Sequence, residues 1–283
     1  MRASGTSSKR NRDMKADLRL CRSLLFLPAS NPRAVEKARG LGADMVVLDL
    51  EDAVKPAHKD EARAAAVEAA RGFPGLCAIR INSIEPWHRP DLEAVAASSA
   101  DYVVVPMTAG PEAPREAARA TGKPVLAMIE TARGVLGAAA IAPQTAGLIA
   151  GTNDLAADLG LRPGGDRAAL VTALQTILLA ARAAGVAAFD GVHNRLDDPE
   201  GFAAQCCEGR SFGFDGKSLI HPSQIEPANR LFGPAEAEIE AAKRLLAAAT
   251  GGAERFEGEM IERMHVEQAR WVLAKARSPV PSS

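Results

Sequence analysis

Two acidic residues come at the ends of consecutive apolar runs. Glu130 ends the run VLAMIE (125–130), and Asp154 follows the run GLIAG (147–151). If both runs are parallel strands of one sheet, their carboxyl ends lie side by side and the two carboxylates can meet. Such carboxylates repel each other unless a cation lies between them. Because Mg²⁺ binds one or two protein carboxylates and leaves positions for water and substrate, the pair predicts a magnesium site. The alternative is that each acid stabilises the start of a following helix.

Arg80 lies inside an otherwise apolar run, LCAIRIN (76–82). A buried guanidinium without an anionic partner is costly, so we expect one. One interpretation is a structural ion pair with Asp49, Glu51 or Asp52 of the preceding run. The other is a clamp on a substrate carboxylate or a developing oxyanion, for which the planar guanidinium is better suited than lysine. The sequence alone supports both equally.

The acids Asp49, Glu51 and Asp52 close the second apolar run, in the segment MVVLDLED (45–52). They have two interpretations. They can hold and orient water molecules bound to a metal ion, behind the residues that bind the ion directly. Alternatively, they are loop charges that face solvent.

Basic residues surround the first apolar run and the segment after it: Arg22, Arg33 and Lys37. They can form a rim for a phosphate-bearing ligand, or they can simply face solvent. The sequence has neither a Walker loop nor a GxGxxG motif, so nucleotide binding through those loops is not supported. The histidines show neither HxH nor HExxH spacing. The one GxSxG match, GRSFG (209–213), precedes an apolar run instead of following one, so no nucleophile elbow supports a serine hydrolase.

Eight short apolar runs alternate with longer Ala-rich segments. Most runs are nearly continuous in apolar residues, which is typical of strands covered on both faces. The segments between them show helical periodicity, most clearly in residues 166–185, where Gly185 marks the stop. This pattern predicts a TIM (β/α)₈ barrel, with an open doubly wound sheet as the alternative. The runs are 23–28, 45–50, 76–82, 101–106, 125–130, 147–151, 186–192 and 212–220.

We expect three parts in the chain. Residues 1–20 are basic and poor in apolar residues, which predicts a disordered tail. Residues 21–232 form the barrel, which at roughly 250 residues would use most of a 283-residue chain. Residues 233–283 contain two amphipathic segments and predict a C-terminal helical extension that packs on its own or a neighbouring subunit.

Composition and charge narrow the possible partners. The net charge of −1 gives no electrostatic attraction to nucleic acid or to an anionic membrane. No apolar run approaches the roughly 20 residues that cross a bilayer. The four cysteines lack CxxC spacing and the density of a disulfide scaffold, so we expect a reducing, cytoplasmic location.

An ordered set of motifs resembles the HpcH/HpaI aldolase family, in its citrate lyase β-subunit-like branch. The motifs are RSLLFLPASNPRAVEKA, ADMVVLDLEDAV with KDEAR behind it, IRINS, IETARG, GTNDLAADLG and FDGKSLIHPSQI. The resemblance implies a TIM barrel that assembles as a trimer or hexamer. It also implies a Mg²⁺-dependent carbon–carbon lyase that cleaves 3-hydroxyacyl thioesters such as malyl-CoA, citramalyl-CoA or a citryl thioester. The expected partners are therefore a 2-oxo acid and an acyl-CoA or acyl-carrier thioester.

The resemblance also implies roles for individual residues. The metal ligands fall on Glu130 and Asp154, with Glu130 also beside the substrate, and the substrate-binding arginine falls on Arg80. Arg22 and the NPRxxxK stretch, which contains Arg33 and Lys37, fall near the thioester.

The chain departs from the family pattern at two positions. After the fourth apolar run the family commonly has Pro-Lys, whereas this chain has Pro106-Met107. The late GKMID motif appears as GEMIE (258–262), so the acid expected to act in a neighbouring subunit's site is Glu262 instead of Asp. The added methylene preserves proton transfer but changes its reach. Two alternative functions follow: a class II pyruvate aldolase acting on free 2-oxo-4-hydroxy acids, and a non-catalytic citrate lyase-like subunit.

Overall fold

The computed structural model describes residues 17–162, 167–249, 254–256 and 259–276. Most of the expected disordered tail, residues 1–16, lies outside this description. The last residues of the expected tail are ordered, which corrects that prediction: Leu18–Leu20 form the 3₁₀ helix η1, and Leu18 is buried. The Asp17 carboxylate starts this turn by accepting a hydrogen bond of 3.1 Å from the Arg19 backbone N–H. The ordered domain therefore begins before residue 21.

Eight parallel strands form a closed barrel in which each strand pairs with the next and β8 pairs with β1. The predicted TIM barrel is thus confirmed, and the open sheet is excluded. The register places Asp49 beside both Pro28 and Arg80, so acid and arginine share one edge of the barrel. The strands are β1 Ser23–Pro28, β2 Met45–Asp49, β3 Leu76–Arg80, β4 Tyr102–Val105, β5 Val125–Ile129, β6 Gly147–Ala150, β7 Ala187–Asp190 and β8 Gly216–Leu219.

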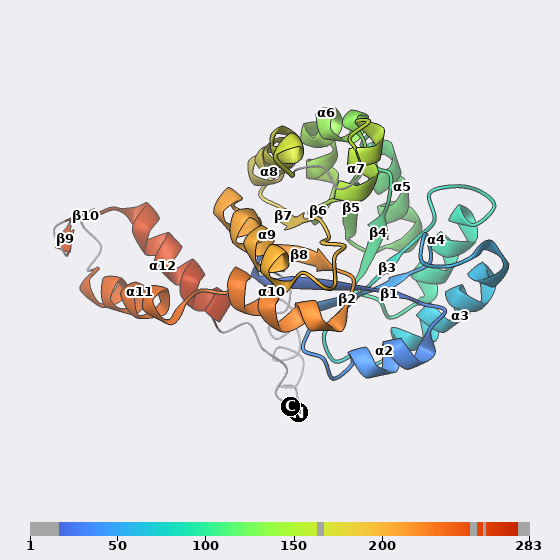
Figure 1. The fold of residues 1–283 in the computed structure, drawn as a ribbon, viewed down its shortest axis with the longest axis horizontal. Helices are drawn as coiled ribbons and strands as arrows, with labels where there is room; N and C mark the ends of the chain where they lie inside the picture. Colours follow the sequence, from blue (N-terminus) through green and yellow to red (C-terminus); the bar gives the residue numbers. More distant parts are fainter. Residues whose placement is uncertain (1–16, 163–166, 250–253, 257–258, 277–283) are drawn as a thin grey trace, which may run out of the picture.

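Helices surround the barrel and connect consecutive strands, as Figure 1 shows. Asn31 starts the first by accepting a hydrogen bond from the Ala34 backbone N–H, with Pro32 in its first turn. Gly185 ends another in the left-handed conformation, as expected from the sequence. These helices are α2 Pro32–Ala38, α3 Lys59–Ala69, α4 His88–Ala97, α5 Glu112–Thr121, α6 Ala132–Ile141, α7 Thr152–Asp158, α8 Val171–Ala184, α9 Pro199–Phe212 and α10 Ile225–Phe232.

Successive strand residues point to opposite faces, which divides the core into two clusters. Leu24 belongs to the cluster that fills the barrel interior together with Met45 and Phe189. Its neighbour Leu25 belongs to the larger cluster between the strands and the helices. The strands are therefore buried on both faces, which explains why their sequences are almost continuously apolar.

The segment 167–184 is long and apolar enough to cross a membrane by composition alone. In the structure it forms η4 (Arg167–Leu170) and α8, and Leu174 and Ile177 of α8 are fully buried. The helix packs against α6 and β7, so its apolar face belongs to the outer core of the barrel.

The C-terminal extension projects from the side of the barrel (Figure 1). It contains α11 (Glu236–Ala248), the paired strands β9 (Glu254–Phe256) and β10 (Glu259–Ile261), and α12 (Arg263–Ala276), which packs against α11. The buried Lys275 ammonium donates a 2.6 Å hydrogen bond to the Asp215 carbonyl oxygen, just before β8. The guanidinium of Arg19 lies over the Trp271 ring, 5.0 Å from its centre. The base of the extension is therefore fixed to its own barrel.

Candidate active site

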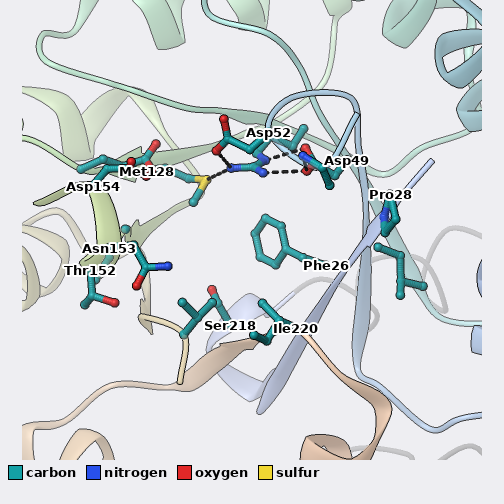
Figure 2. Close-up of a pocket in the computed structure, with 17 residues that line it drawn as sticks. Phe26, Pro28, Asp49, Asp52, Met128, Thr152, Asn153, Asp154, Ser218 and Ile220 are labelled. Carbon is teal, nitrogen blue, oxygen red and sulfur yellow. Dashed lines mark hydrogen bonds and ion pairs between the residues drawn. The ribbon is translucent and has the colours of Figure 1, made fainter. Parts of the chain in front are cut away.

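The carboxyl ends of the strands open into a cavity of about 390 Å³, drawn in Figure 2. Its walls come from β1, β2, β3, β5, β6 and β8 and from the segments that follow β2, β5, β6, β7 and β8. Small-molecule sites commonly have volumes of roughly 300–1,000 Å³, and barrel enzymes place them at this end. The cavity is therefore the candidate active site.

Glu130 and Asp154 meet in this cavity. Glu130 follows β5, Asp154 lies in the first turn of α7 after β6, and the two strands are paired. Gly151 makes the approach possible, because a Cβ at that position would lie 2.3 Å from the Glu130 Cγ. Helix α6 is capped by Thr131 and not by Glu130, so the helix-cap alternative does not account for this acid.

The Glu130 carboxylate is 2% exposed and accepts a 2.8 Å hydrogen bond from the Met107 backbone N–H. Burial raises the pKa of Glu130 to about 7; the Met107 N–H opposes this change, whereas a hydrogen bond with the Asp154 side chain adds to it. A cation bound between the two carboxylates would favour their charged forms. Met107 occupies a left-handed backbone conformation, with φ of 49°. Met107 therefore contributes to the site through its backbone N–H.

The pair fits Mg²⁺, because it offers two hard oxygen ligands, one of which is destabilised by burial. Within the described residues, no group of three or more His, Cys, Asp or Glu could hold a metal ion. Glu130 and Asp154 would hold the ion, and water and substrate oxygens would supply its other ligands.

Arg80 lines the same cavity and is held by acids of the turn after β2. Its Nε and Nη2 each lie 2.6 Å from an Asp49 carboxylate oxygen, and its Nη1 lies 2.9 Å from Glu51 and 3.5 Å from Asp52. The ion-pair interpretation is thus confirmed. The position of Arg80 on the cavity wall is also what a substrate clamp requires, and its guanidinium lies 5.5 Å from the Phe26 ring centre.

Carboxyl groups outnumber cationic groups in this part of the site. Burial raises the pKa of Glu51 to about 8, which Arg80 opposes and the nearby Asp52 and Glu130 reinforce. Asp49 accepts hydrogen bonds from the Glu51 and Ala53 backbone N–H groups, and this fixes the shape of the turn. Asp49 and Glu51 are thus held against Arg80 while the Asp52 side chain is largely exposed, and the action of these acids on metal-bound water stays a prediction.

The buried Lys59 stabilises the turn after β2 through hydrogen bonds to its backbone, a role that the sequence analysis did not predict. The Lys59 ammonium donates hydrogen bonds of 2.7 Å and 2.8 Å to the Leu50 and Glu51 carbonyl oxygens. It also donates a 2.6 Å hydrogen bond to Asn82, which in turn donates to Asp91. The only sequence signal was the lysine of KDEAR, at the start of the helix after the acidic run.

The structure contradicts the prediction that Arg22 belongs to a basic rim around the cavity. Arg22 precedes β1 and therefore lies at the amino end of the barrel, away from the cavity. There it is buried in an ion pair with Asp44, with hydrogen bonds of 2.8 Å from Nε and Nη2. Arg33 and Lys37 are exposed on α2, which follows the carboxyl end of β1, but neither is among the described residues that line the cavity.

Glu262 lies just before α12, at the end of the extension that points away from the barrel (Figure 1). It is exposed, and its backbone N–H donates a 3.0 Å hydrogen bond to the His265 Nδ1. Within one chain, Glu262 is therefore separated from the cavity, and its action in a neighbouring subunit stays a prediction.

Comparisons with known proteins agree with the motifs and the fold. The HpcH/HpaI aldolase/citrate lyase family profile matches residues 22–222. The chain is 44% identical to a (3S)-malyl-CoA thioesterase of Cereibacter sphaeroides (strain KD131 / KCTC 12085), covering 91% of this chain and 95% of the relative. It is 35% identical to citrate lyase subunit beta of Leuconostoc mesenteroides subsp. cremoris, covering 92% and 94%.

A solved structure is similar throughout. Protein CitE of Mycobacterium tuberculosis, crystallised with magnesium, acetoacetate and coenzyme A, has a TM-score of 0.76 and 35% identity, with 92% of this chain and 99% of that chain covered. The chain therefore belongs to the HpcH/HpaI aldolase/citrate lyase family, in its citrate lyase β-subunit-like branch.

Proposed function

We propose that this chain is a Mg²⁺-dependent carbon–carbon lyase. Its substrate is a 3-hydroxyacyl thioester of the malyl-CoA, citramalyl-CoA or citryl type, which it cleaves to an acyl thioester and a 2-oxo acid. The observation that carries the proposal is the meeting of Glu130 and Asp154 in one cavity with Arg80. Relatives that act on malyl-CoA or belong to citrate lyase support the thioester class.

The reaction moves an electron pair onto oxygen. A base removes the proton of the 3-hydroxyl group, the bond between C2 and C3 breaks, and the electron pair of that bond forms the enolate of the acyl thioester. A proton added at C2 then completes the product. Glu130 and Asp154 would hold Mg²⁺, which would supply positive charge to the substrate oxygens. Arg80 contributes a fixed guanidinium on the same cavity wall, where it stabilises developing negative charge.

The proton at C2 is assigned to Glu262 of a neighbouring subunit in a homotrimer or hexamer. The extension supports this assignment, because its base is fixed to the barrel while Glu262 is exposed at the far end. The test mixes a Glu262→Ala chain with an Arg80→Lys chain, both of low activity, and isolates the mixed oligomers. Partial recovery of activity is expected, and no recovery in verified mixed oligomers contradicts shared sites. A monomeric active enzyme contradicts them too.

Thioester hydrolysis is a second candidate function, favoured by the 44% identity to a (3S)-malyl-CoA thioesterase. In that reaction water adds to the thioester carbonyl and the thiol leaves, while the bond between C2 and C3 stays intact. Both reactions begin from the same bound substrate, so the cavity described above serves either one.

Product analysis separates these functions. Purified protein is incubated with Mg²⁺ and (3S)-malyl-CoA or citramalyl-CoA, and the products are identified by liquid chromatography and mass spectrometry. A lyase releases acetyl-CoA with glyoxylate or pyruvate, whereas a thioesterase releases free CoA with malate or citramalate. Turnover of free 2-oxo-4-hydroxy acids alone would instead indicate a pyruvate aldolase. Turnover of acyl-CoA by the isolated chain shows that no acyl-carrier partner is required, and absence of every product contradicts the proposal.

A further inference from the structure

Ser218 presents a buried hydroxyl group to the cavity. It is the third residue of β8, is 2% exposed, and lines the cavity wall. Among the described residues, four buried side-chain polar atoms lack a hydrogen-bond partner, and of their residues only Ser218 lines this cavity. Buried polar groups are normally hydrogen-bonded, so we expect a bound molecule to supply the partner of this hydroxyl.

The barrel fixes the direction of this side chain. Ser218 pairs with Leu24 of β1, which points into the barrel interior. Its neighbour Lys217 points the opposite way, where its ammonium lies 2.9 Å from an Asp190 carboxylate oxygen behind the barrel wall. The orientation of Ser218 therefore follows from strand register, whereas its hydroxyl hydrogen is free to rotate toward a ligand.

The charges in the cavity explain why a neutral donor matters there. Arg80 is the only cation among the described lining residues, and all three of its guanidinium nitrogens already face the acids Asp49, Glu51 and Asp52. The other charged lining residues are carboxylates, including Glu130 and Asp154. An anionic substrate would therefore gain from a hydrogen-bond donor in addition to Arg80.

Figure 2 shows where such a donor lies. Ser218 and Ile220 occupy the side of the cavity opposite Asp49, Asp52 and Met128, and the Phe26 ring lies between the two sides. Ser218 itself is 2% exposed, and the neighbouring Ile220 and Phe26 are apolar. A hydrogen bond made there is shielded from water, which strengthens it.

We propose that Ser218 is a substrate-binding residue whose Oγ–H donates a hydrogen bond to an anionic oxygen of the bound 2-oxo acid. The proposal rests on the proposed function, because it takes a 2-oxo acid as the ligand. Ser218 thus complements Arg80 from the opposite wall and helps to set the orientation of the acid.

The missing partner makes a distinctive variant effect possible. Removal of a hydrogen-bonded buried hydroxyl normally destabilises a protein, whereas removal of an unpaired one is neutral or stabilising. Ser218→Ala should therefore preserve the melting temperature while weakening acid binding. A hydrogen bond to a charged group corresponds to about a tenfold to hundredfold change in affinity.

The experiment titrates the full, Mg²⁺-saturated chain with pyruvate and with glyoxylate by isothermal calorimetry. Ser218→Ala is compared with Ser218→Cys, which keeps the approximate shape but is a weak donor. The matched control is Ser211→Ala, on the exposed side of α9, where the hydroxyl donates to the Glu208 carbonyl oxygen. Both Ser218 variants should bind the acids at least tenfold more weakly, with unchanged Mg²⁺ affinity and melting temperature, and the Ser211 variant should bind like the parent.

The outcomes separate the two proposals. Parent-like acid binding by Ser218→Ala, or a lower melting temperature with weaker Mg²⁺ binding, overturns the role of Ser218 alone. A parent protein that binds Mg²⁺ but neither acid, and that releases no product from either thioester, overturns the proposed function and the Ser218 inference with it.

Discussion

Arg80 combines a structural and a chemical role in one side chain. Because it neutralises Asp49, which is 1% exposed, Arg80→Ala would leave a buried charge unpaired and lower stability together with activity. Arg80→Lys is the sharper test, because it keeps the charge but loses the planar fork. We expect kcat/KM to fall at least about hundredfold, with a melting temperature within a few degrees of the parent value. The control Arg71→Lys, in an exposed pair with Glu68, should retain activity. Near-parent activity of Arg80→Lys would contradict the role.

Glu130 makes magnesium binding depend on pH. Its folded-state pKa of about 7 lies above the usual 4.5, so the metal-free folded protein holds a proton that the unfolded chain has released. The resulting stabilisation is lost as pH rises through 7. Mg²⁺ competes with this proton, so the increase in melting temperature that it causes should be larger at about pH 8 than at about pH 6. Glu130→Gln should show little increase at either pH. Equal increases in the parent would contradict this linkage.

At the scale of elements, the turn between β2 and α3 depends on Lys59. Lys59→Met removes the donor shared by the Leu50 and Glu51 carbonyl oxygens and by Asn82. We expect a loss of about 2–3 kcal/mol in unfolding free energy, measured by urea denaturation, because hydrogen bonds from a charged donor are lost inside the protein. KM should rise as well, since the turn carries the acids that hold Arg80.

The exposed Lys55→Met is the control in the same connection between β2 and α3. Parent-like stability and KM for Lys59→Met would show that the turn needs no such support.

At the scale of the whole molecule, Lys275 connects the extension to the barrel floor. Burial lowers the pKa of Lys275 from 10.5 to about 8, although the nearby Asp215 opposes this change. Between these two values the folded state binds fewer protons than the unfolded chain, so this residue's contribution to stability becomes more favourable as pH rises. The unfolding free energy of the parent, relative to Lys275→Met, should therefore rise by about 1–3 kcal/mol across this window. The exposed Lys243→Met should show the parent's dependence. A pH-independent difference between the parent and Lys275→Met would contradict the shift.

Strand direction and local pattern made much of the site predictable. Acids that close consecutive buried runs must share one edge of a parallel barrel, which is why Glu130, Asp154 and Arg80 could be placed together. The same rule excludes Arg22, since a residue that precedes a strand lies at the other end of the barrel. The expected place of Arg22 in the rim was wrong because it followed closeness in sequence instead of strand polarity, whereas a rim role for Arg33 and Lys37 stays a prediction.

The sequence by itself determined the buried strands, their order and the chemical types at their carboxyl ends, because these depend on periodicity and direction along the chain. Only the tertiary structure decided that the Asp49 carboxylate pairs with the Arg80 guanidinium and that the Lys59 ammonium donates to the turn after β2. It alone also showed that the Ser218 hydroxyl has no hydrogen-bond partner in the protein. It also decided that Glu262 lies far along the extension from its own cavity. These outcomes depend on barrel closure and on contacts between distant segments, which no local pattern encodes.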